Sequence, residues 1–207
     1  QAAEDLMLAK SFHSVGLNEI LSAVRVPKGS FYHYFSSKEQ FGVELITHYL
    51  SEHTARIKNL FAAHDGSARD KFVDYWSAAI GWAAEGECRQ CCLVAKLGLE
   101  VSSFSEPMRK VLADGLRAWR KIYEDAIRDG QTDKSIRRDL DPAEAAAVIQ
   151  DVWQGAMQRM QAERSVAPLR GAARFLAAWL AVPSAKPLHS PGKTTSRQLK
   201  LSKVSRK

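Results

Sequence analysis

The sequence predicts an all-α protein. Along most of its 207 residues, apolar side chains recur three and four positions apart, which is the spacing of an amphipathic helix. A serine or aspartate is followed within two residues by proline at Ser105 and at Asp141. Such pairs mark helix starts, because the side chain caps the first N–H groups and proline suits the first turn. No stretch predicts a strand.

The stretch from Leu17 to Lys38 predicts two short helices with a tight joint, followed by the start of a third. The first helix covers 17–23, and the joint is Val24-Arg25-Val26-Pro27. The second helix opens at Pro27, which suits a first helical position, and carries the aromatic run of residues 31–35. This is the layout of a helix-turn-helix, whose second helix enters the major groove of DNA.

The rest of the chain predicts further helices on either side of this unit. We expect them at residues 2–11, 38–63 (capped by Ser36 or Ser37), 67–84, 91–101, 106–129 (ended by Gly130), 142–164 and 168–181. The stretch 91–101 is apolar around its circumference and is expected to be buried. We therefore divide the chain into a helix-turn-helix head (1–38), a helical domain (39–182) and a disordered basic tail (183–207).

The net charge of +7 belongs to the tail. Seven basic side chains and no acidic one follow Pro183, so residues 1–182 carry no net charge. General basicity is therefore not a sign of DNA binding here. The local pattern is more informative, because Arg25, Lys28 and Lys38 are accompanied by no acid between Val24 and Lys38. The tail could add nonspecific DNA affinity, although a plain disordered extension is the simpler interpretation.

The sequence gives no sign of catalysis, a bound metal, a cofactor or a membrane span. It contains no carboxylate pair, nucleophile motif or glycine-rich phosphate loop, and His53 is expected to be solvated. The chain has three cysteines, Cys88, Cys91 and Cys92, and no secretory signal. An odd number of cysteines in such a chain argues against a disulfide framework. The pair Cys88-x-x-Cys91 has no second ligand pair, so zinc is not expected. No run approaches the ~18 apolar residues that a membrane span needs.

The second helix of the helix-turn-helix has the chemistry that DNA recognition requires. Lys28 stands at its start, where a cation reaches phosphate or guanine, and Ser30, Tyr32 and His33 can face outward. Phe31 and Phe35 are four residues apart and face the core, with Tyr34 between the two faces. The alternative is an ordinary helical hairpin with an aromatic core face. That alternative does not explain why tyrosine and histidine side chains face outward next to a basic segment that contains no acid.

The segment VPKGSFYHYFSSKEQF, with the preceding GLNEIL, resembles the signature of the TetR family of transcriptional repressors. The resemblance covers roughly residues 1–182 and implies a three-helix head joined by a long fourth helix to an all-helical domain for ligand binding and dimerisation. It implies a cytoplasmic, nucleoid-associated homodimer that binds double-stranded, pseudo-palindromic operator DNA and is released by a small-molecule inducer. The dimer interface would be made by the last two helices, 142–164 and 168–181. The implied DNA contacts are Lys28, Ser30, Tyr32, His33 and Tyr34, with Lys38 on phosphate.

Within the family, CCLVAKLGLEVSSFSEPMR is similar to a stretch of the NemR- and AcuR-like subgroup, which responds to reactive electrophiles or to acrylate. The position that matches the main sensor cysteine of NemR is Ser102 in this chain. Candidate pocket residues are Trp76, Ile80, Trp82, Cys92, Lys96, Trp119, Tyr123 and Trp153. The alternative for most of the aromatic ones is a place in the core, and for Cys92 it is that of a buried structural thiol.

Two other classes of function are alternatives. An enzyme or cofactor-binding bundle is disfavoured by the missing catalytic motifs. The second is a helical dimeric small-molecule-binding protein with impaired DNA binding. The chain begins at Gln1, inside what reads as an amphipathic helix. We therefore expect a truncated first helix, and such a helix would support the recognition helix less well.

Overall fold

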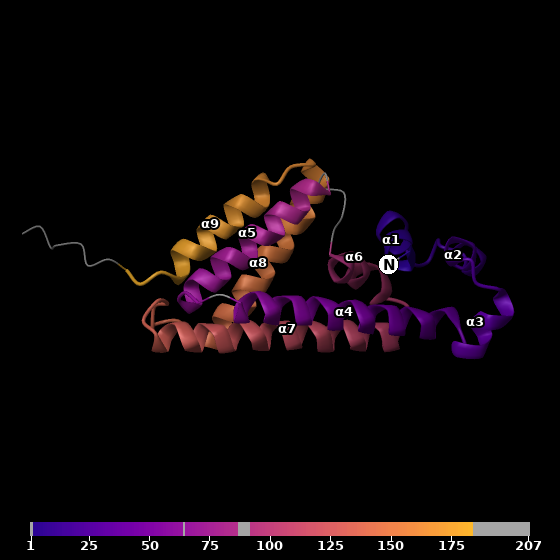
Figure 1. Ribbon diagram of the computed structural model, residues 1–207, viewed down its shortest axis with the longest axis horizontal. Coiled ribbons are helices and arrows are strands. Elements are labelled where there is room, and N and C mark those ends of the chain that lie inside the picture. Colours follow the sequence, from indigo (N-terminus) through magenta and orange to yellow (C-terminus); the bar gives the residue numbers. More distant parts are fainter. Residues whose placement is uncertain (1, 64, 87–91, 184–207) are drawn as a thin grey trace, which may run out of the picture.

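The computed structural model describes residues 2–63, 65–86 and 92–183, and over those residues it is built of α-helices (Figure 1). In chain order they are α1 (Ala2–Ala9), α2 (Leu17–Val24), α3 (Lys28–Tyr34), α4 (Lys38–Ala62), α5 (Ala68–Glu85), α6 (Leu93–Val101), α7 (Glu106–Thr132), α8 (Pro142–Glu163) and α9 (Ala167–Leu180). Outside the helices, Ile136 and Ala181 form an isolated antiparallel β-bridge. The all-α prediction is confirmed.

The head consists of α1, α2 and α3, and its joint has the geometry of a tight turn. Arg25 adopts the left-handed conformation (φ 54°, ψ 40°), and its N–H is directed at the last carbonyls of α2. Pro27 is extended and precedes α3, so it caps the helix from outside instead of occupying its first turn. Ile20, Leu21 and Phe31 are buried where the helices meet. Met7 of α1 is also fully buried, so this helix contributes to the core of the head.

The long helix α4 leaves the head and extends along α7, and Figure 1 shows the two side by side along the longest axis of the molecule. The N-cap of α4 is Ser37, whose hydroxyl accepts the Gln40 N–H at 3.0 Å. Ile46, Leu50 and Ile57 form the buried stripe of α4. Because Gly115 has no side chain, α7 approaches α4 closely, and a Cβ at that position would overlap Leu50.

The other end of the molecule is a bundle of α5, α8 and α9 above the far half of the α4–α7 pair (Figure 1). The helix α5 begins with a capping box in which Ser67 and Asp70 bond each other's backbone. Phe72 and Trp76 of α5 are fully buried, as are Ile149 of α8 and Leu176 of α9. The short helix α6 contacts α1 of the head as well as α4 and α7.

Two further sequence predictions about helices are wrong in detail. Gly130 does not end its helix, because α7 continues to Thr132. The glycine is needed inside the helix, since a Cβ there would lie 2.5 Å from Ile136 Cδ1. The stretch 91–101 is not buried on all sides, because Leu99 is 79% exposed while Leu93, Val94 and Leu97 are buried. A single helix face therefore supplies the packing of α6.

Other sequence predictions fall where the structure gives no test. Cys88, Cys91 and the basic tail lie outside the described residues. Among the helices that are described, none is long and apolar enough to cross a membrane.

Candidate DNA-binding surface and ligand cavity

The outer face of α3 presents the residues predicted to contact DNA. Lys28, Ser30, Tyr32 and His33 are all exposed, and Tyr34, at 72%, is more exposed than its predicted place between the two faces implies. The opposite face is anchored by Phe31, which is buried. A polar and aromatic surface is thus held on a helix of only seven residues.

An aromatic cluster attaches α3 to the beginning of α4. The ring of Phe31 lies 5.1 Å from that of Phe35 and 5.7 Å from that of Phe41, and the rings of Phe35 and Phe41 are 5.2 Å apart. Aromatic pairs at such distances add to the hydrophobic stabilisation of their burial. These ring contacts attach the core face of α3 to the first turn of α4.

Lys38, predicted to contact phosphate, is engaged inside the protein. Its ammonium donates to the Phe12 carbonyl at 2.6 Å and lies 4.7 Å above the centre of the Phe12 ring. Partial burial lowers the pKa of Lys38, and the charge of Glu100 opposes that shift. The observed role of this side chain is to tie the start of α4 to the loop after α1, and its contact with phosphate stays a prediction.

Further polar contacts join the head to α6, and the beginning of α4 to α7. The Lys96 ammonium of α6 donates to the Leu8 carbonyl, and Glu100 accepts the His13 backbone N–H at 2.7 Å. Glu39 accepts the Ser105 hydroxyl at 2.6 Å, at the residue that caps α7. The head is therefore held to the helical domain through α6 as well as through α4.

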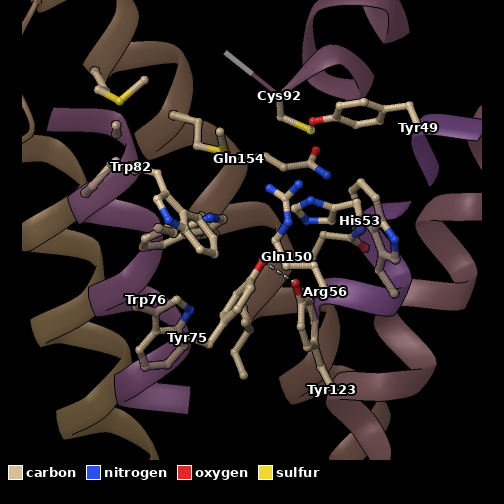
Figure 2. A pocket seen from close by; sticks show the side chains of 18 residues that line it. Tyr49, His53, Arg56, Tyr75, Trp76, Trp82, Cys92, Tyr123, Gln150 and Gln154 are labelled. Carbon is tan, nitrogen blue, oxygen red and sulfur yellow. Dashed lines mark hydrogen bonds between the residues drawn. The ribbon is translucent and has the colours of Figure 1, made fainter. Parts of the chain in front are cut away.

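A cavity of about 170 Å³ lies in the helical domain, between α4, α5, α7 and α8 (Figure 2). Aromatic rings make much of its wall, and a small number of polar groups interrupt them. It is lined by Tyr49, His53, Arg56, Tyr75, Trp76, Ala79, Trp82, Ala83, Cys92, Trp119, Tyr123, Ile149, Gln150, Trp153, Gln154, Met157, Met160 and Leu169.

The structure brings together most of the predicted pocket residues but not all of them. Trp76, Trp82, Cys92, Trp119, Tyr123 and Trp153 line the cavity. Ile80 does not line it and packs, half-buried, against the core. Lys96 does not line it either, because its ammonium is directed to the head. That the six residues bind a ligand remains a prediction.

Sequence reasoning missed the polar residues that α4 and α8 contribute to the wall. Tyr49, His53 and Arg56 share one face of α4, and Gln150 and Gln154 share one face of α8. The expectation that His53 is solvated is wrong, since its ring lies 6.0 Å from Tyr49 and 4.5 Å from Trp119. Their spacing of three and four residues was a usable signal, but it does not distinguish a cavity wall from a solvated face.

Burial keeps the titratable groups of the cavity neutral. Burial, and next the charge of Arg56, lower the pKa of His53 to about 4. Burial raises the pKa of Tyr75 to about 12 and that of Tyr123 well above its ordinary value. The pKa of the Cys92 thiol is also raised by burial. Of the described residues that line the cavity, Arg56 alone therefore carries a full charge at neutral pH.

The polar groups are arranged in two pairs around Arg56. The Tyr49 hydroxyl lies 3.5 Å from the Cys92 sulfur and accepts the Leu93 N–H at 3.3 Å. The hydroxyls of Tyr75 and Tyr123 lie 3.2 Å apart. Figure 2 shows the Arg56 guanidinium between these two pairs, beside His53. Its carbon lies 5.2 Å from the centre of the Trp82 ring.

Among the described residues, no three histidine, cysteine, aspartate or glutamate side chains gather as a metal site would need. The arrangement is suited to binding a small molecule, since an apolar wall with a few convergent polar groups is the usual form of a ligand site.

Comparison with known proteins places both ends of the molecule in one family. The model for bacterial regulatory proteins of the tetR family matches residues 1–45, and that for the tetracyclin repressor-like C-terminal domain matches residues 68–176. The repressor NemR of Escherichia coli K12 is 32% identical over 181 residues, which are 87% of this chain and 91% of NemR. The regulator AcuR of Cereibacter sphaeroides is 34% identical over 178 residues, which are 84% of this chain and 80% of AcuR.

The solved structures agree with this assignment. The crystal structure of reduced E. coli NemR superposes with a TM-score of 0.81 and 32% identity, over 88% of this chain and 95% of that one. Both the helix-turn-helix head and the helical domain are thus covered by the same relatives. The chain belongs to the TetR family of bacterial transcriptional regulators.

Proposed function

We propose that this protein is a ligand-responsive transcriptional repressor that binds a pseudo-palindromic operator as a homodimer and is released by a small molecule in the cavity. The relatives NemR and DhaR are both named HTH-type transcriptional repressors. In this assignment Lys28, Ser30, Tyr32, His33 and Tyr34 contact DNA, and the cavity in Figure 2 is the effector site.

The observation that carries the proposal is that one helix serves both sites. At its beginning, Phe41 of α4 packs on the recognition helix. Two to four turns later the same helix supplies Tyr49, His53 and Arg56 to the cavity wall. A ligand that repositions these side chains acts on the helix that carries the DNA-binding surface. The two sites are therefore joined by a continuous rigid element.

Release from DNA requires a change in the distance between the two heads. A dimer reads two half-sites one helical turn apart, about 34–36 Å, or a multiple of that distance. The ligand must prefer the conformation in which the heads no longer match this spacing, because equal affinity for both conformations shifts neither population. The contacts of α6 with Leu8 and His13 give the cavity a second connection to the head, since α6 begins beside Cys92.

The dimer interface is assigned to α8 and α9. These helices pack on each other, and each presents an exposed apolar side chain, Val148 on α8 and Phe175 on α9. Phe175 is 55% exposed. Burial of such side chains against a second copy would stabilise the dimer.

DNA binding is tested by fluorescence anisotropy of the intact dimer on duplexes from the promoter region of its own gene and on a scrambled duplex. We expect tight, salt-sensitive binding to one promoter duplex and much weaker binding to the scrambled one. Lys28→Ala should weaken operator binding by about tenfold, whereas Lys110→Ala on α7 should not. A uniform loss on all duplexes would assign Lys28 to phosphate, and a loss restricted to one base position would assign it to guanine.

The proposal is wrong if the wild-type dimer binds promoter and scrambled duplexes equally, or if neither is bound at low salt. In the alternative function, a dimeric small-molecule-binding protein with impaired DNA binding, the cavity binds ligand and the promoter duplex is not bound. No observation favours that alternative. The described residues of α1 bury Ala3 and Met7 in the core of the head.

A further inference from the structure

We infer that the cavity binds a planar aromatic monocarboxylate, whose carboxylate is held by Arg56 and whose ring lies among the tryptophans. This inference rests on the proposal that the cavity is the effector site, and it adds the chemical class of the effector. It follows from the charge, the hydrogen-bonding groups and the size of the cavity.

The charge of the cavity favours a single negative charge. Arg56 supplies one positive charge, and no aspartate or glutamate is among the described residues that line the cavity. Its guanidinium is close to the aromatic ring of Trp82 and has no carboxylate partner among the described residues. A planar guanidinium binds a carboxylate through two parallel hydrogen bonds. Arg56 is exposed to solvent, so water hydrates its charge when no ligand is bound, and a monoanion is the ligand whose charge matches it.

Hydrogen-bond donors surround the guanidinium. His53 is neutral at physiological pH and can donate one ring N–H. One of the Tyr75 and Tyr123 hydroxyls donates to the other, so the accepting hydroxyl can donate its own proton to a ligand. Figure 2 shows the amide of Gln154 beside the guanidinium as well. An acceptor-rich group such as a carboxylate can satisfy several of these donors at once.

An unpaired donor in the wall also indicates a missing acceptor. The Trp76 side chain is buried, and its indole N–H has no hydrogen-bond partner in the described part of the structure. An indole N–H is a donor only, and a buried donor without a partner carries a free-energy penalty. Trp76 lines the cavity, so a ligand oxygen placed against this wall would remove the penalty.

The size and walls of the cavity favour a single ring. Its volume is about 170 Å³, and an engineered apolar cavity of about 150 Å³ in another protein holds benzene. Four of the five tryptophans of the chain, Trp76, Trp82, Trp119 and Trp153, line it. Planar rings stack well on such walls. An aliphatic acid of the same charge would use the arginine but not the aromatic surface.

Isothermal titration calorimetry on the full-length dimer tests this inference with three probes. Benzoate has the ring and the charge, benzamide has the ring without the charge, and acetate has the charge without the ring. We expect benzoate to bind at least tenfold more tightly than benzamide, and acetate to bind more weakly than both. Equal affinities for benzoate and benzamide, or no binding of benzoate at millimolar concentration, would overturn the inference.

Two variants locate the carboxylate. Arg56→Gln should abolish the preference for benzoate and leave the affinity for benzamide unchanged, which also shows that the cavity is intact. Lys58 is exposed like Arg56 but does not line the cavity. Lys58→Gln therefore removes the same charge two residues along α4 and should keep the preference. A preference that survives Arg56→Gln would contradict the assignment.

Operator binding without ligand is measured on the same samples. If the wild type binds its operator but not benzoate, the ligand class is wrong and the proposed function stands. If it binds benzoate tightly but no operator, the ligand class is right and the proposed function fails.

Discussion

His53 shows how the surroundings of one residue set the chemistry of the cavity. Its ring lies between those of Tyr49 and Trp119, where burial and the nearby Arg56 hold its pKa at about 4. In the unfolded chain its pKa is near the ordinary value of about 6.5. Between these two pH values the unfolded chain binds a proton that the folded protein does not. Stability is therefore lost as the pH falls from about 6.5 towards 4.

We predict that His53→Gln reduces this loss. From pH 7 to pH 5 the wild type should lose about 2 kcal/mol of unfolding free energy per protomer through His53, and the variant should not. Urea unfolding at both pH values and one protein concentration measures the difference. The exposed His48 on the same helix provides the control, because His48→Gln should keep the wild-type loss. If His53→Gln and the wild type lose the same amount, His53 is not held neutral in the folded protein.

Single residues also show where prediction of the site from sequence ends. Six predicted residues line the cavity, because bulky apolar side chains in a helical domain are found where helices meet. Tyr49, His53 and Arg56 were missed, since a polar face on a long helix usually faces water. This face of α4 becomes a cavity wall because α5 and α8 pack opposite it. No local sequence pattern encodes that packing.

At the scale of elements, a glycine allows the close contact between α4 and α7. Leu50 of α4 occupies the space that a side chain at position 115 would fill. The starts of α4, α7 and α8 were predictable, because Ser37, Ser105 and Asp141 cap them as the sequence indicates. The end of α7 was not, because Gly130 is required by its contact with Ile136 and not by a turn.

We predict that Gly115→Ala destabilises the protein relative to Gly81→Ala. Both residues are helical, but a Cβ at Gly81 meets no atom within 4 Å, whereas one at Gly115 overlaps Leu50. Alanine at position 81 should stabilise the helix by about 0.5–1 kcal/mol. At position 115 the overlap should outweigh that gain by about 1–3 kcal/mol. Equal unfolding free energies of the two variants in urea would show that α4 and α7 can separate without cost.

At the scale of the whole molecule, function depends on holding two heads at a fixed distance. Each head is fixed to its own α4, and the proposed interface of α8 and α9 lies on the bundle at the far end of the molecule (Figure 1). The distance between the two recognition helices is therefore set by the dimer interface and by the angle of α4. A change at either place alters the fit to the operator.

We predict that Phe175→Glu breaks the dimer. Each interface would lose two phenylalanine rings and gain two carboxylates, which have to be desolvated beside each other. Sedimentation velocity at micromolar concentration should show a dimer for the wild type and a monomer for the variant. Leu99→Glu is the matched control, because Leu99 is exposed on α6, outside the proposed interface. A dimeric Phe175→Glu protein would place the interface elsewhere.

The most direct test of the central claim is hydroxyl-radical footprinting of the intact protein on its promoter DNA. We predict two symmetric protected half-sites, one helical turn or a multiple of it apart, that disappear together in Phe175→Glu. The account is contradicted if a single half-site is protected, if protection is unchanged by loss of the dimer, or if unrelated DNA gives the same pattern.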